Sequence, residues 1–290
     1  MLVKKSGTIL LNVNSKQIGL VYRNNRNDYS FPKGHLKKDE TLQQCAVRET
    51  EEETLRANHL CITKEIYTLK YVTPMGENIE CYFYISIDDG PTSQNIDLKD
   101  QEKLIWVNSN DVENKLSYNN LKVLWSRIKD SVMAILENNG NISPAILTDL
   151  GICPTCYDKE NNKCFYGNIS DKFLFENNDF ECFLASNPRA NGHVIISTKK
   201  HYKDMMEIPD ELCSNVFVFA KRVMNILKDV YVSESVYLCT MCDGPMNHFH
   251  VQLIPRYNFE KRGAKNFVKP RMNYVEDKEK IEKIRNLLKK

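Results

Sequence analysis

Three glutamates in one short segment, FPKGHLKKDETLQQCAVRETEEET (residues 31–54), have the type and spacing to bind a metal ion. Apolar and small residues recur at helical spacing from Leu42, so Glu49, Glu52 and Glu53 fall on one neighbouring helical face. Like charges three and four positions apart repel, and each pair costs about 0.2–0.5 kcal/mol in an isolated helix. A hard cation such as Mg²⁺ prefers oxygen ligands and turns this repulsion into attraction. The alternative is a solvated charged face.

A second group of polar side chains alternates with apolar ones in NHFHVQLIPR (residues 247–256). A period of two is typical of a β-strand, so His248, His250 and Gln252 share one face of that strand. A neutral imidazole held in one tautomer is a suitable nucleophile at pH 7. The alternative for any single histidine here is a buried residue without a chemical role.

The composition is that of a globular protein of two domains. The chain has 290 residues, 42% of them hydrophobic and 27% charged, with a formal net charge of +2, which argues against a general nucleic-acid or membrane binder. It has neither a signal peptide nor an apolar run of about 18 residues, so we expect a cytoplasmic protein. The ten cysteines are therefore expected to be buried thiols with a possible metal site, and two Cys-x-x-Cys pairs begin at Cys153 and Cys239.

Strands and helices that can position these groups follow from the hydrophobic pattern. In the first half, strands are predicted over 7–13, 17–23, 62–72, 79–87 and 104–107, with a closing helix over 119–139. The segment NNGNISPA (138–145) indicates a linker. Afterwards the pattern predicts strands near 172–177, 180–186, 192–198, 235–242 and 248–256, with a helix over about 209–230. The chain ends in a basic tail, for which a solvated terminal helix and a flap over an anionic ligand are both open.

The first segment resembles the Nudix box. The resemblance rests on Gly34, on Glu40, and on the run Arg48-Glu49-x-x-Glu52-Glu53 at the spacing of that motif. It implies an α/β/α sandwich in which the three glutamates and the Gly34 carbonyl bind Mg²⁺ or Mn²⁺, and Arg48 orients Glu49. The implied reaction is attack of metal-activated water on a phosphoanhydride.

The segment departs from the Nudix pattern at its end. Leu55 and Arg56 stand where glycine and an aliphatic residue are usual, and Thr50 stands where an aliphatic residue is usual. Leucine resists the left-handed conformation that glycine accepts at the end of a helix, so we expect a different helix exit.

The flanking sequences resemble the Nudix branch that hydrolyses diadenosine and diphosphoinositol polyphosphates. That likeness, in YSFPKGH and KLSYNNLK, implies a phosphate contact for Lys33 and stacking on a base for Tyr118. For Tyr118 a packed surface aromatic is the alternative. Glu102 is a candidate for an additional metal ligand or base.

The second half resembles the histidine-triad (HIT) superfamily. His248, His250, Gln252 and the following LIPR, together with NPRANGHVIISTKKH, carry the likeness over about residues 150–275. It implies that His250 attacks the α-phosphorus and carries a covalent nucleotidyl group. Gln252 can donate a hydrogen bond but not a proton, so a leaving group stable as an anion is favoured, as in phosphoanhydrides and nucleotide sugars. Both hydrolysis and transfer to phosphate or a sugar phosphate remain open.

The same resemblance suggests a substrate site and a zinc site. Asn187 and Arg256 are candidate substrate contacts, although Ala185 stands where the family commonly has a ribose-binding Asp or Asn. Two thiolates and two imidazoles suit tetrahedral Zn²⁺ in a structural role. The open alternatives are unliganded cysteines and a four-cysteine site with Cys239 and Cys242. The implied zinc ligands are Cys153, Cys156, His201 and His248.

We therefore predict an α+β protein of two domains, a Nudix hydrolase domain over 1–138 and a HIT-like domain with an antiparallel sheet over 148–290, joined by a linker at 139–147. The predicted function is hydrolysis of nucleotide phosphoanhydrides, with dinucleoside polyphosphates as the common substrate. A HIT half acting as nucleotidyltransferase or phosphorylase, and a nucleotide sensor or RNA-end-processing protein with one inactive domain, are the alternatives. A homodimer through the HIT domain is the expected assembly, with nucleotides rather than nucleic acid or membrane as partners.

Overall fold

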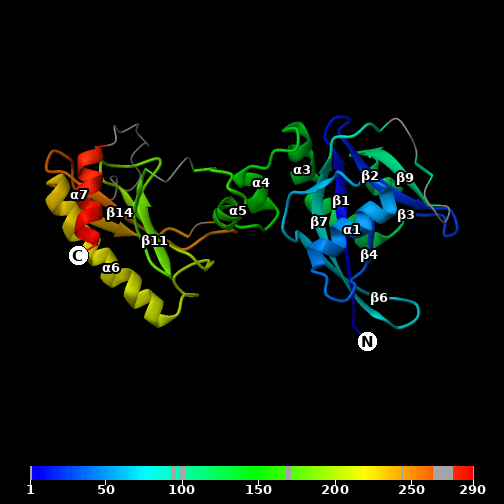
Figure 1. Ribbon diagram of the computed structural model, residues 1–290, viewed down its shortest axis with the longest axis horizontal. Helices are drawn as coiled ribbons and strands as arrows, with labels where there is room; N and C mark the ends of the chain where they lie inside the picture. Colours follow the sequence, from blue (N-terminus) through cyan, green and yellow to red (C-terminus); the bar gives the residue numbers. More distant parts are fainter. Residues whose placement is uncertain are drawn as a thin grey trace. The chain divides into compact units, whose positions relative to one another are not determined.

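The chain divides into two compact units, Met1–Ile152 and Cys153–Lys290. The computed structural model describes residues 2–92, 96–97, 102–166, 171–242, 244–263 and 277–289. Part of the predicted basic tail, residues 264–276, lies outside these ranges. Each unit has its own sheet, so the expected α+β organisation with two sheets is confirmed (Figure 1).

A mixed sheet forms the first unit. Its strand order is β5-β7-β1-β2-β9-β8, with β3 on β2, β4 on β1 and β6 on β7, and β1 runs parallel to β7 along its whole length. The elements are β1 (Leu2–Asn12), β2 (Gln17–Arg23), β3 (Asp28–Ser30), β4 (Lys33–His35), α1 (Leu42–Thr54), β5 (Leu60–Cys61), β6 (Tyr67–Val72), β7 (Asn78–Asp88), β8 (Ile96–Asp97), β9 (Glu102–Asn108), α2 (Val112–Lys115), α3 (Asn119–Glu137) and α4 (Pro144–Asp149).

Helices α1 and α3 pack on opposite faces of this sheet. Thr8 of β1 faces α1, because its hydroxyl lies 2.8 Å from the hydroxyl of Thr50. Phe83 of β7 pairs with the position before Thr8, so it points to the other face. There its ring is 6.2 Å from that of Phe31, which in turn lies 6.3 Å from the ring of Trp125 in α3. This arrangement is the three-layered sandwich expected from the sequence.

An antiparallel sheet of five strands, in the order β10-β11-β12-β14-β13, forms the second unit. Strand β14 lies between β12 and β13, so both of its neighbours fix its register. The elements are α5 (Pro154–Asn161), β10 (Phe173–Glu176), β11 (Phe180–Leu184), β12 (Val194–Thr198), α6 (Asp210–Tyr231), β13 (Ser235–Cys239), β14 (His250–Arg256) and α7 (Lys278–Leu288).

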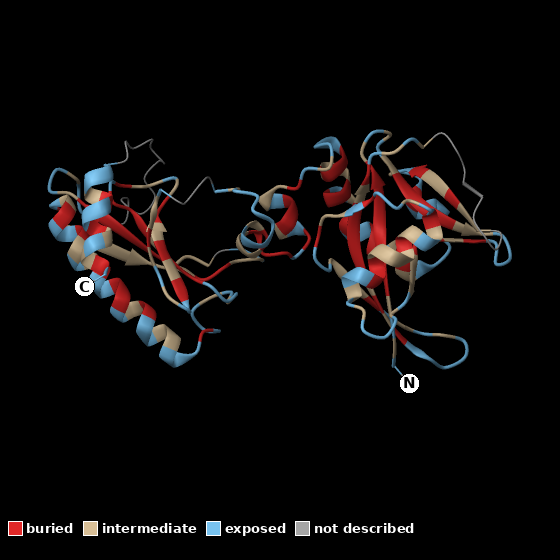
Figure 2. Cartoon of the chain, viewed as in Figure 1, coloured by how far each residue is buried: buried red, intermediate tan, exposed pale blue. Residues whose placement is uncertain are grey.

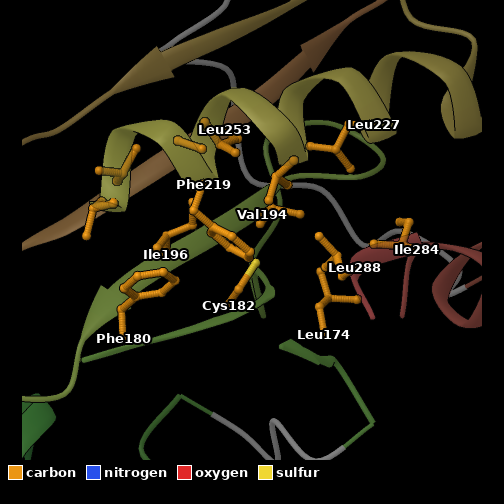
Figure 3. Packing of buried hydrophobic residues seen from close by; sticks show 14 of the residues in the cluster. Leu174, Phe180, Cys182, Val194, Ile196, Phe219, Leu227, Leu253, Ile284 and Leu288 are labelled. Carbon is orange, nitrogen blue, oxygen red and sulfur yellow. The ribbon is translucent and has the colours of Figure 1, made fainter. Parts of the chain in front are cut away.

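Helices α6 and α7 cover one face of this second sheet. Val251 and Leu253 of β14 are fully buried in the resulting core, which also takes Phe219 of α6 and Ile284 of α7 (Figure 3). Alternate residues of β14 therefore belong to the core. His250 and every second residue after it face the other side of the sheet. In both units the buried residues follow the inner strands and one side of each helix (Figure 2).

Helix α1 begins and ends with well-defined caps. Thr41 and Gln44 form a reciprocal capping box at its start. At its end Leu55 adopts the left-handed conformation, with φ 55° and ψ 28°, and its N–H donates to the Glu51 carbonyl at 2.8 Å. The expectation of a different helix exit was therefore wrong, because leucine takes the backbone conformation of the usual glycine. Thr50, the other departure, is buried, and its hydroxyl also donates to the Ala46 carbonyl.

The segment predicted as a linker, 139–147, contains the start of a helix. The structure divides the chain after Ile152, and α4 begins within the predicted linker. Ser143 caps α4 by accepting a hydrogen bond from the N–H of Ile146, and Ile146 itself is buried. Serine followed by proline is a signal for a loop and also for a helix start, which explains the difference.

Within the described part of the chain, no helix combines the length and apolar character that crossing a membrane needs.

The strained end of α1 leads to a prediction about stability. Leu55→Gly should raise the free energy of unfolding of the first unit by about 1 kcal/mol. A left-handed leucine costs roughly 1–2 kcal/mol, and the greater conformational entropy of glycine in the unfolded chain offsets part of the gain from removing that strain. Leu55 is 59% exposed, so little packing is lost. Urea unfolding followed by tryptophan fluorescence measures this unit, because both tryptophans, Trp106 and Trp125, lie in it.

Val232→Gly is the matched control. Val232 ends α6 in the second unit with the same left-handed conformation and is 84% exposed. The Val232→Gly change should leave the urea unfolding transition followed by tryptophan fluorescence unchanged. A Leu55→Gly protein no more stable than wild type would contradict the assignment of strain.

Candidate functional site

Arg48 gathers the acidic side chains around α1. Its Nε donates to Glu40 Oε1 at 2.7 Å, and its Nη1 donates to Glu49 Oε1 at 2.6 Å and to Glu52 Oε2 at 2.9 Å. The hydrogen bonds from Arg48 hold the pKa of Glu40 down at about 2. One guanidinium thus binds three carboxylates, which offsets the repulsion that their spacing predicts.

Gly34 allows α1 to lie directly against β4. A Cβ atom at this position would lie 1.8 Å from Glu49 Oε2, so any side chain here would displace the Glu49 carboxylate from its present position. Gly34 is held in place by pairing with Ser6 of β1. The bare backbone therefore brings a peptide group next to the carboxylate of Glu49, as the sequence motif predicts.

Glu53 is the glutamate of α1 whose pKa is raised by its surroundings. Burial raises its pKa to about 7, the charge of Lys33 opposes this shift, and the nearby charges of Glu102 and Glu49 add to it. Its Oε2 accepts a hydrogen bond from the N–H of Lys33 at 2.8 Å. Glu102, predicted as an additional ligand or base, begins β9 opposite Arg23 and is close enough to affect Glu53.

The donor set around Glu53 fits a hard divalent cation. The predicted ligands are carboxylates and a peptide oxygen, which Mg²⁺ and Mn²⁺ prefer, and a cation would stabilise the charged form that burial disfavours at Glu53. The carboxylates do not yet converge as a metal cluster among the described residues. Glu52 is instead bound by Arg48 and by Lys37 Nζ, the latter at 3.2 Å.

Lys33 and Tyr118, the predicted substrate contacts of this unit, form hydrogen bonds with different residues. The Nζ of Lys33 donates to Ser30 Oγ at 3.3 Å. The hydroxyl of Tyr118 donates to Asp28, which forms an ion pair of 2.7 Å with Arg23. Tyr118 is 42% exposed, so its ring is anchored at the hydroxyl while much of its surface remains accessible. The sequence did not indicate the supporting pair, because it follows from the pairing of β2 with β3.

In the second unit, hydrogen bonds fix the tautomer of His250. Its Nδ1 lies 2.8 Å from the carbonyl oxygen of His248, which can only accept, so Nδ1 carries the proton. The Nε2 atom then has a free lone pair, and the side-chain amide of Gln252 donates to it at 3.2 Å. An imidazole in this state has a nucleophilic nitrogen and a neighbouring amide donor on one face of β14.

The position of His250 and Gln252 is set by strand pairing on both sides. His250 pairs with Ser197 of β12, and Gln252 lies between Ile195 of β12 and Cys239 of β13. Cross-strand partners share a face of the sheet, so Cys239 lies beside Gln252. The sequence predicted the alternation along β14 but not which strands flank it.

Four side chains of the second unit form a candidate metal centre. Their ligand atoms lie within 4.8 Å of one another, the one such His, Cys or acidic group found among the described residues: Cys153, Cys156, His201 and His248. These are the four predicted ligands, and neither Cys239 nor Cys242 is among them.

The distances within this set fit tetrahedral zinc. His248 Nδ1 lies 3.6 Å from Cys153 Sγ and 3.4 Å from Cys156 Sγ, and His201 Nδ1 lies 3.6 Å from Cys156 Sγ. Zn–S and Zn–N bonds of ordinary length at the tetrahedral angle separate sulfur and nitrogen by about 3.6 Å. His248 Nε2 donates to the Thr198 carbonyl at 2.7 Å, which leaves Nδ1 as the ligand atom. The pKa of Cys153 lies well below its usual value because Cys156 and His248 stabilise its thiolate.

The other two predicted contacts of this unit have different surroundings. Asn187 is exposed on the loop after β11. Arg256 is only 4% exposed, and its guanidinium forms an ion pair of 2.8 Å with Glu234 and donates to Ser235 Oγ. A substrate contact by Arg256 requires it to leave these partners.

Comparisons with known proteins agree with this division. The family model of the NUDIX domain matches residues 3–124, and that of the HIT domain matches residues 166–259. An uncharacterised HIT-like protein of Methanocaldococcus jannaschii is 32% identical over 100 residues, which are 33% of this chain and 76% of that protein.

Two solved structures are each similar to about half of this chain at lower identity. The Ap4A hydrolase of C. elegans is 21% identical over 47% of this chain and 98% of its own, with a TM-score of 0.38. A zinc-bound histidine triad family protein of Mycobacterium smegmatis is 17% identical over 47% of this chain and 93% of its own, also with a TM-score of 0.38.

The box around α1, the histidines of β14 and the two family matches identify both halves of the molecule. The chain carries a Nudix domain in its first unit and belongs to the HIT family through its second.

Proposed function

We propose that the protein is a bifunctional hydrolase of nucleotide phosphoanhydrides and that dinucleoside polyphosphates are its substrates. The observation that carries the proposal is the pair of centres, each suited to that bond. One is an oxygen-ligand set for a divalent cation around Glu53, and the other is an imidazole nucleophile at His250 with an amide donor beside it. Dinucleoside polyphosphates contain a diphosphate, on which the first centre could act, and an α-phosphorus, on which the second could act.

In the Nudix unit, Glu49, Glu52, Glu53 and the Gly34 carbonyl are the proposed ligands of Mg²⁺ or Mn²⁺. When bound, the cation neutralises the diphosphate and lowers the pKa of the attacking water. Arg48 holds Glu49 in place through the 2.6 Å hydrogen bond. Glu53 is also a suitable base once ionised, because its pKa of about 7 lies near neutrality.

In the HIT unit, His250 Nε2 is the proposed nucleophile. It forms a bond to the α-phosphorus, and the bond between that phosphorus and the bridging oxygen breaks, so the leaving phosphate departs as an anion. Gln252 donates its amide hydrogen to a phosphate oxygen but cannot protonate the leaving group. Water then releases the nucleotide from His250. The proposed zinc ligand His248 lies two residues away and fixes the strand.

A nucleotidyltransferase or phosphorylase is a second candidate for the HIT unit alone. The observation that favours it is Gln252, because a site without a proton donor works equally with phosphate or a sugar phosphate as the acceptor. Product masses with water alone and with added phosphate distinguish the two reactions.

The proposal of one reaction at each centre gives the first prediction about activity. Incubated with diadenosine tetraphosphate, Glu52→Gln should lose Mg²⁺-dependent cleavage by about a hundredfold or more, because the cation is worth several kcal/mol in the transition state. His250→Ala should lose only the metal-independent reaction and its protein-bound nucleotide, measured by mass spectrometry of the quenched protein. Glu51→Gln, which changes a neighbouring charge at a position that the motif leaves unspecified, is the control and should keep both activities. Loss of both by either active-centre variant would contradict two separate centres.

The raised pKa of Glu53 predicts a pH-dependent stability of the metal-free protein. Because the folded pKa of about 7 exceeds the usual glutamate pKa of 4.5, the contribution of Glu53 to stability is fully present below pH 4.5 and is lost as the pH rises through 7. Glu53→Gln should therefore match wild type at pH 4 and exceed it by roughly 2–3 kcal/mol at pH 8, in urea unfolding followed by tryptophan fluorescence. Mg²⁺ at pH 8 should stabilise wild type alone. Equal stability of both proteins at pH 8 would exclude the burial of this charge.

A zinc ion at the cluster of cysteines and histidines predicts a measurable stoichiometry. The purified protein should hold one Zn²⁺ by elemental analysis, and Cys156→Ser should bind it less tightly by at least tenfold, because a thiolate ligand is lost. Cys164→Ser is the matched control, since Cys164 is exposed and lies outside the cluster. Equal zinc content and affinity in the Cys156→Ser protein would place the metal elsewhere.

A further inference from the structure

A pair of cysteines in the HIT unit lies beside the proposed nucleophile and takes no part in the metal centre. Cys239 is the last residue of β13, and Cys242 follows it in a segment that forms neither helix nor strand. Both are free thiols and both are partly exposed. The cluster of metal-ligating side chains found among the described residues includes neither of them. We call Cys239 and Cys242 the dithiol pair.

Cys239 lies on the same face of the sheet as the reaction centre. Leu238 packs against the core on the helix-covered face, so its neighbour Cys239 points to the opposite face. There Cys239 is the cross-strand partner of Gln252, whose amide lies 3.2 Å from His250 Nε2. Side chains of cross-strand partners pack against each other. The side chain of Cys239 therefore restricts the rotamers of the amide that contacts the proposed nucleophile.

The pairing of Cys239 with Gln252 ends the ladder of an edge strand. Among the described strands β13 pairs only with β14, and this pair is the last in their register. The end of an edge strand opens at a lower free energy than an inner strand, because no second neighbour holds it. Gln252 itself stays paired with Ile195 of β12. A covalent bond at Cys239 can thus alter its contact with the Gln252 side chain while the sheet and the core remain in place.

The spacing of the dithiol pair suits a disulfide. A disulfide requires Cα atoms about 4.4–6.8 Å apart, and three fully extended residues span about 10 Å, so a modest bend is enough. The segment after β13 has no regular structure, and the sulfur of Cys242 lies 3.7 Å from the hydroxyl of Thr240, the residue next to Cys239. Rotation within residues 240–242 is then sufficient to bring the two sulfurs together.

The two thiols are suited to different steps of a disulfide exchange. Burial raises the pKa of Cys239, and the positive charge of Arg189 opposes this shift. A raised pKa leaves less of the reactive thiolate, so Cys239 is suited to the second step rather than the first. Cys242, which lies beyond the end of the strand ladder, is the thiol that meets an oxidant first.

We propose that the dithiol pair is a reversible modification site, at which small disulfides of the glutathione type close a bond between Cys239 and Cys242 and inactivate the HIT centre. The Cys242 thiolate attacks one sulfur of the small disulfide, whose S–S bond breaks and releases one thiolate. Cys239 then attacks the Cys242 sulfur and displaces the second small thiolate. The protons of the two cysteines pass through solvent to the released thiolates, so the protein loses two hydrogen atoms and the small disulfide becomes two thiols.

The new bond turns Cys239 toward Cys242 and away from Gln252. Without its cross-strand partner the amide of Gln252 is free to rotate away from His250 Nε2, and their contact is lost. The inference rests on the proposed function of His250 and adds a form of regulation to it. The Nudix unit holds neither cysteine, so its reaction continues in the oxidised protein.

The first test is whether the bond forms. After incubation with oxidised glutathione, mass spectrometry of the digested full chain should find the Cys239–Cys242 disulfide in wild type and not in Cys242→Ser. Cys213→Ser is the matched control, because Cys213 is a partly exposed cysteine of α6, and it should form the bond as wild type does. Elemental analysis should show unchanged zinc content. Absence of the bond in wild type would overturn the proposal.

The second test is the reaction of His250 with diadenosine tetraphosphate in the presence of a chelator of Mg²⁺. Oxidation of wild type should slow formation of the protein-bound nucleotide about tenfold, the scale of one lost hydrogen bond, and dithiothreitol should restore it. The Cys242→Ser protein should react at the rate of reduced wild type before and after oxidation. An equal loss in Cys242→Ser would assign the effect to another thiol and overturn the proposal.

Nitrogen NMR of the His250 imidazole separates this inference from the proposed activity, because it needs no substrate. Oxidation should shift the Nε2 resonance, assigned by its loss in His250→Ala, in wild type and not in Cys242→Ser. If no nucleotide modifies His250 but the disulfide and this shift appear, the proposed HIT activity fails and the modification site stands. If the nucleotide is transferred and oxidation changes neither its rate nor the resonance, the modification site fails and the activity stands.

Discussion

The acidic face of α1 depends on the guanidinium of Arg48. Its hydrogen bonds to Glu40, Glu49 and Glu52 neutralise a group of carboxylates that would otherwise repel one another, and Nη2 also donates to the His35 carbonyl at 3.0 Å. The last contact ties the helix to β4. Because arginine has five donors in a fixed plane, a single side chain can do both, which a lysine could not. The helix can therefore keep its charges close to Gly34 and Glu53 before a cation binds.

Charges of both signs act on Glu53. Arg48 balances the carboxylates of α1, whereas Lys5 and Lys33 have no carboxylate of their own within ion-pair distance among the residues described. Burial raises the pKa of Glu53, and the charge of Lys33 opposes that shift.

In the HIT unit, backbone carbonyls position the imidazole of His250. The His248 carbonyl fixes the proton of His250, and the Thr198 carbonyl fixes that of His248. His248 precedes the central strand β14 by two residues and His250 begins it, so the candidate zinc cluster and His250 belong to one short segment. The consequence is a link between metal binding and the orientation of His250 that needs no further side chain.

Sequence alone predicted the two-unit division, most strands and helices and the side chains of the candidate zinc cluster, because spacing and alternation are local properties of the chain. It predicted α1 from periodicity and the zinc set from resemblance, and the structure brings together Cys153, Cys156, His201 and His248. It misjudged the exit at Leu55, whose N–H closes the helix on the Glu51 carbonyl, and the segment 139–147, where the loop signal is outweighed by the burial of Ile146 in α4.

Only the tertiary structure decided which distant residues meet. The register of β1 with β4 places Lys5 beside Lys33, and the pairing of β2 with β3 anchors Tyr118 through Asp28. Backbone carbonyls select the tautomers, and every residue has such a carbonyl, so no residue type signals them. Burial raises the pKa of Glu53 to about 7, and burial depends on the whole fold rather than on neighbours in the chain.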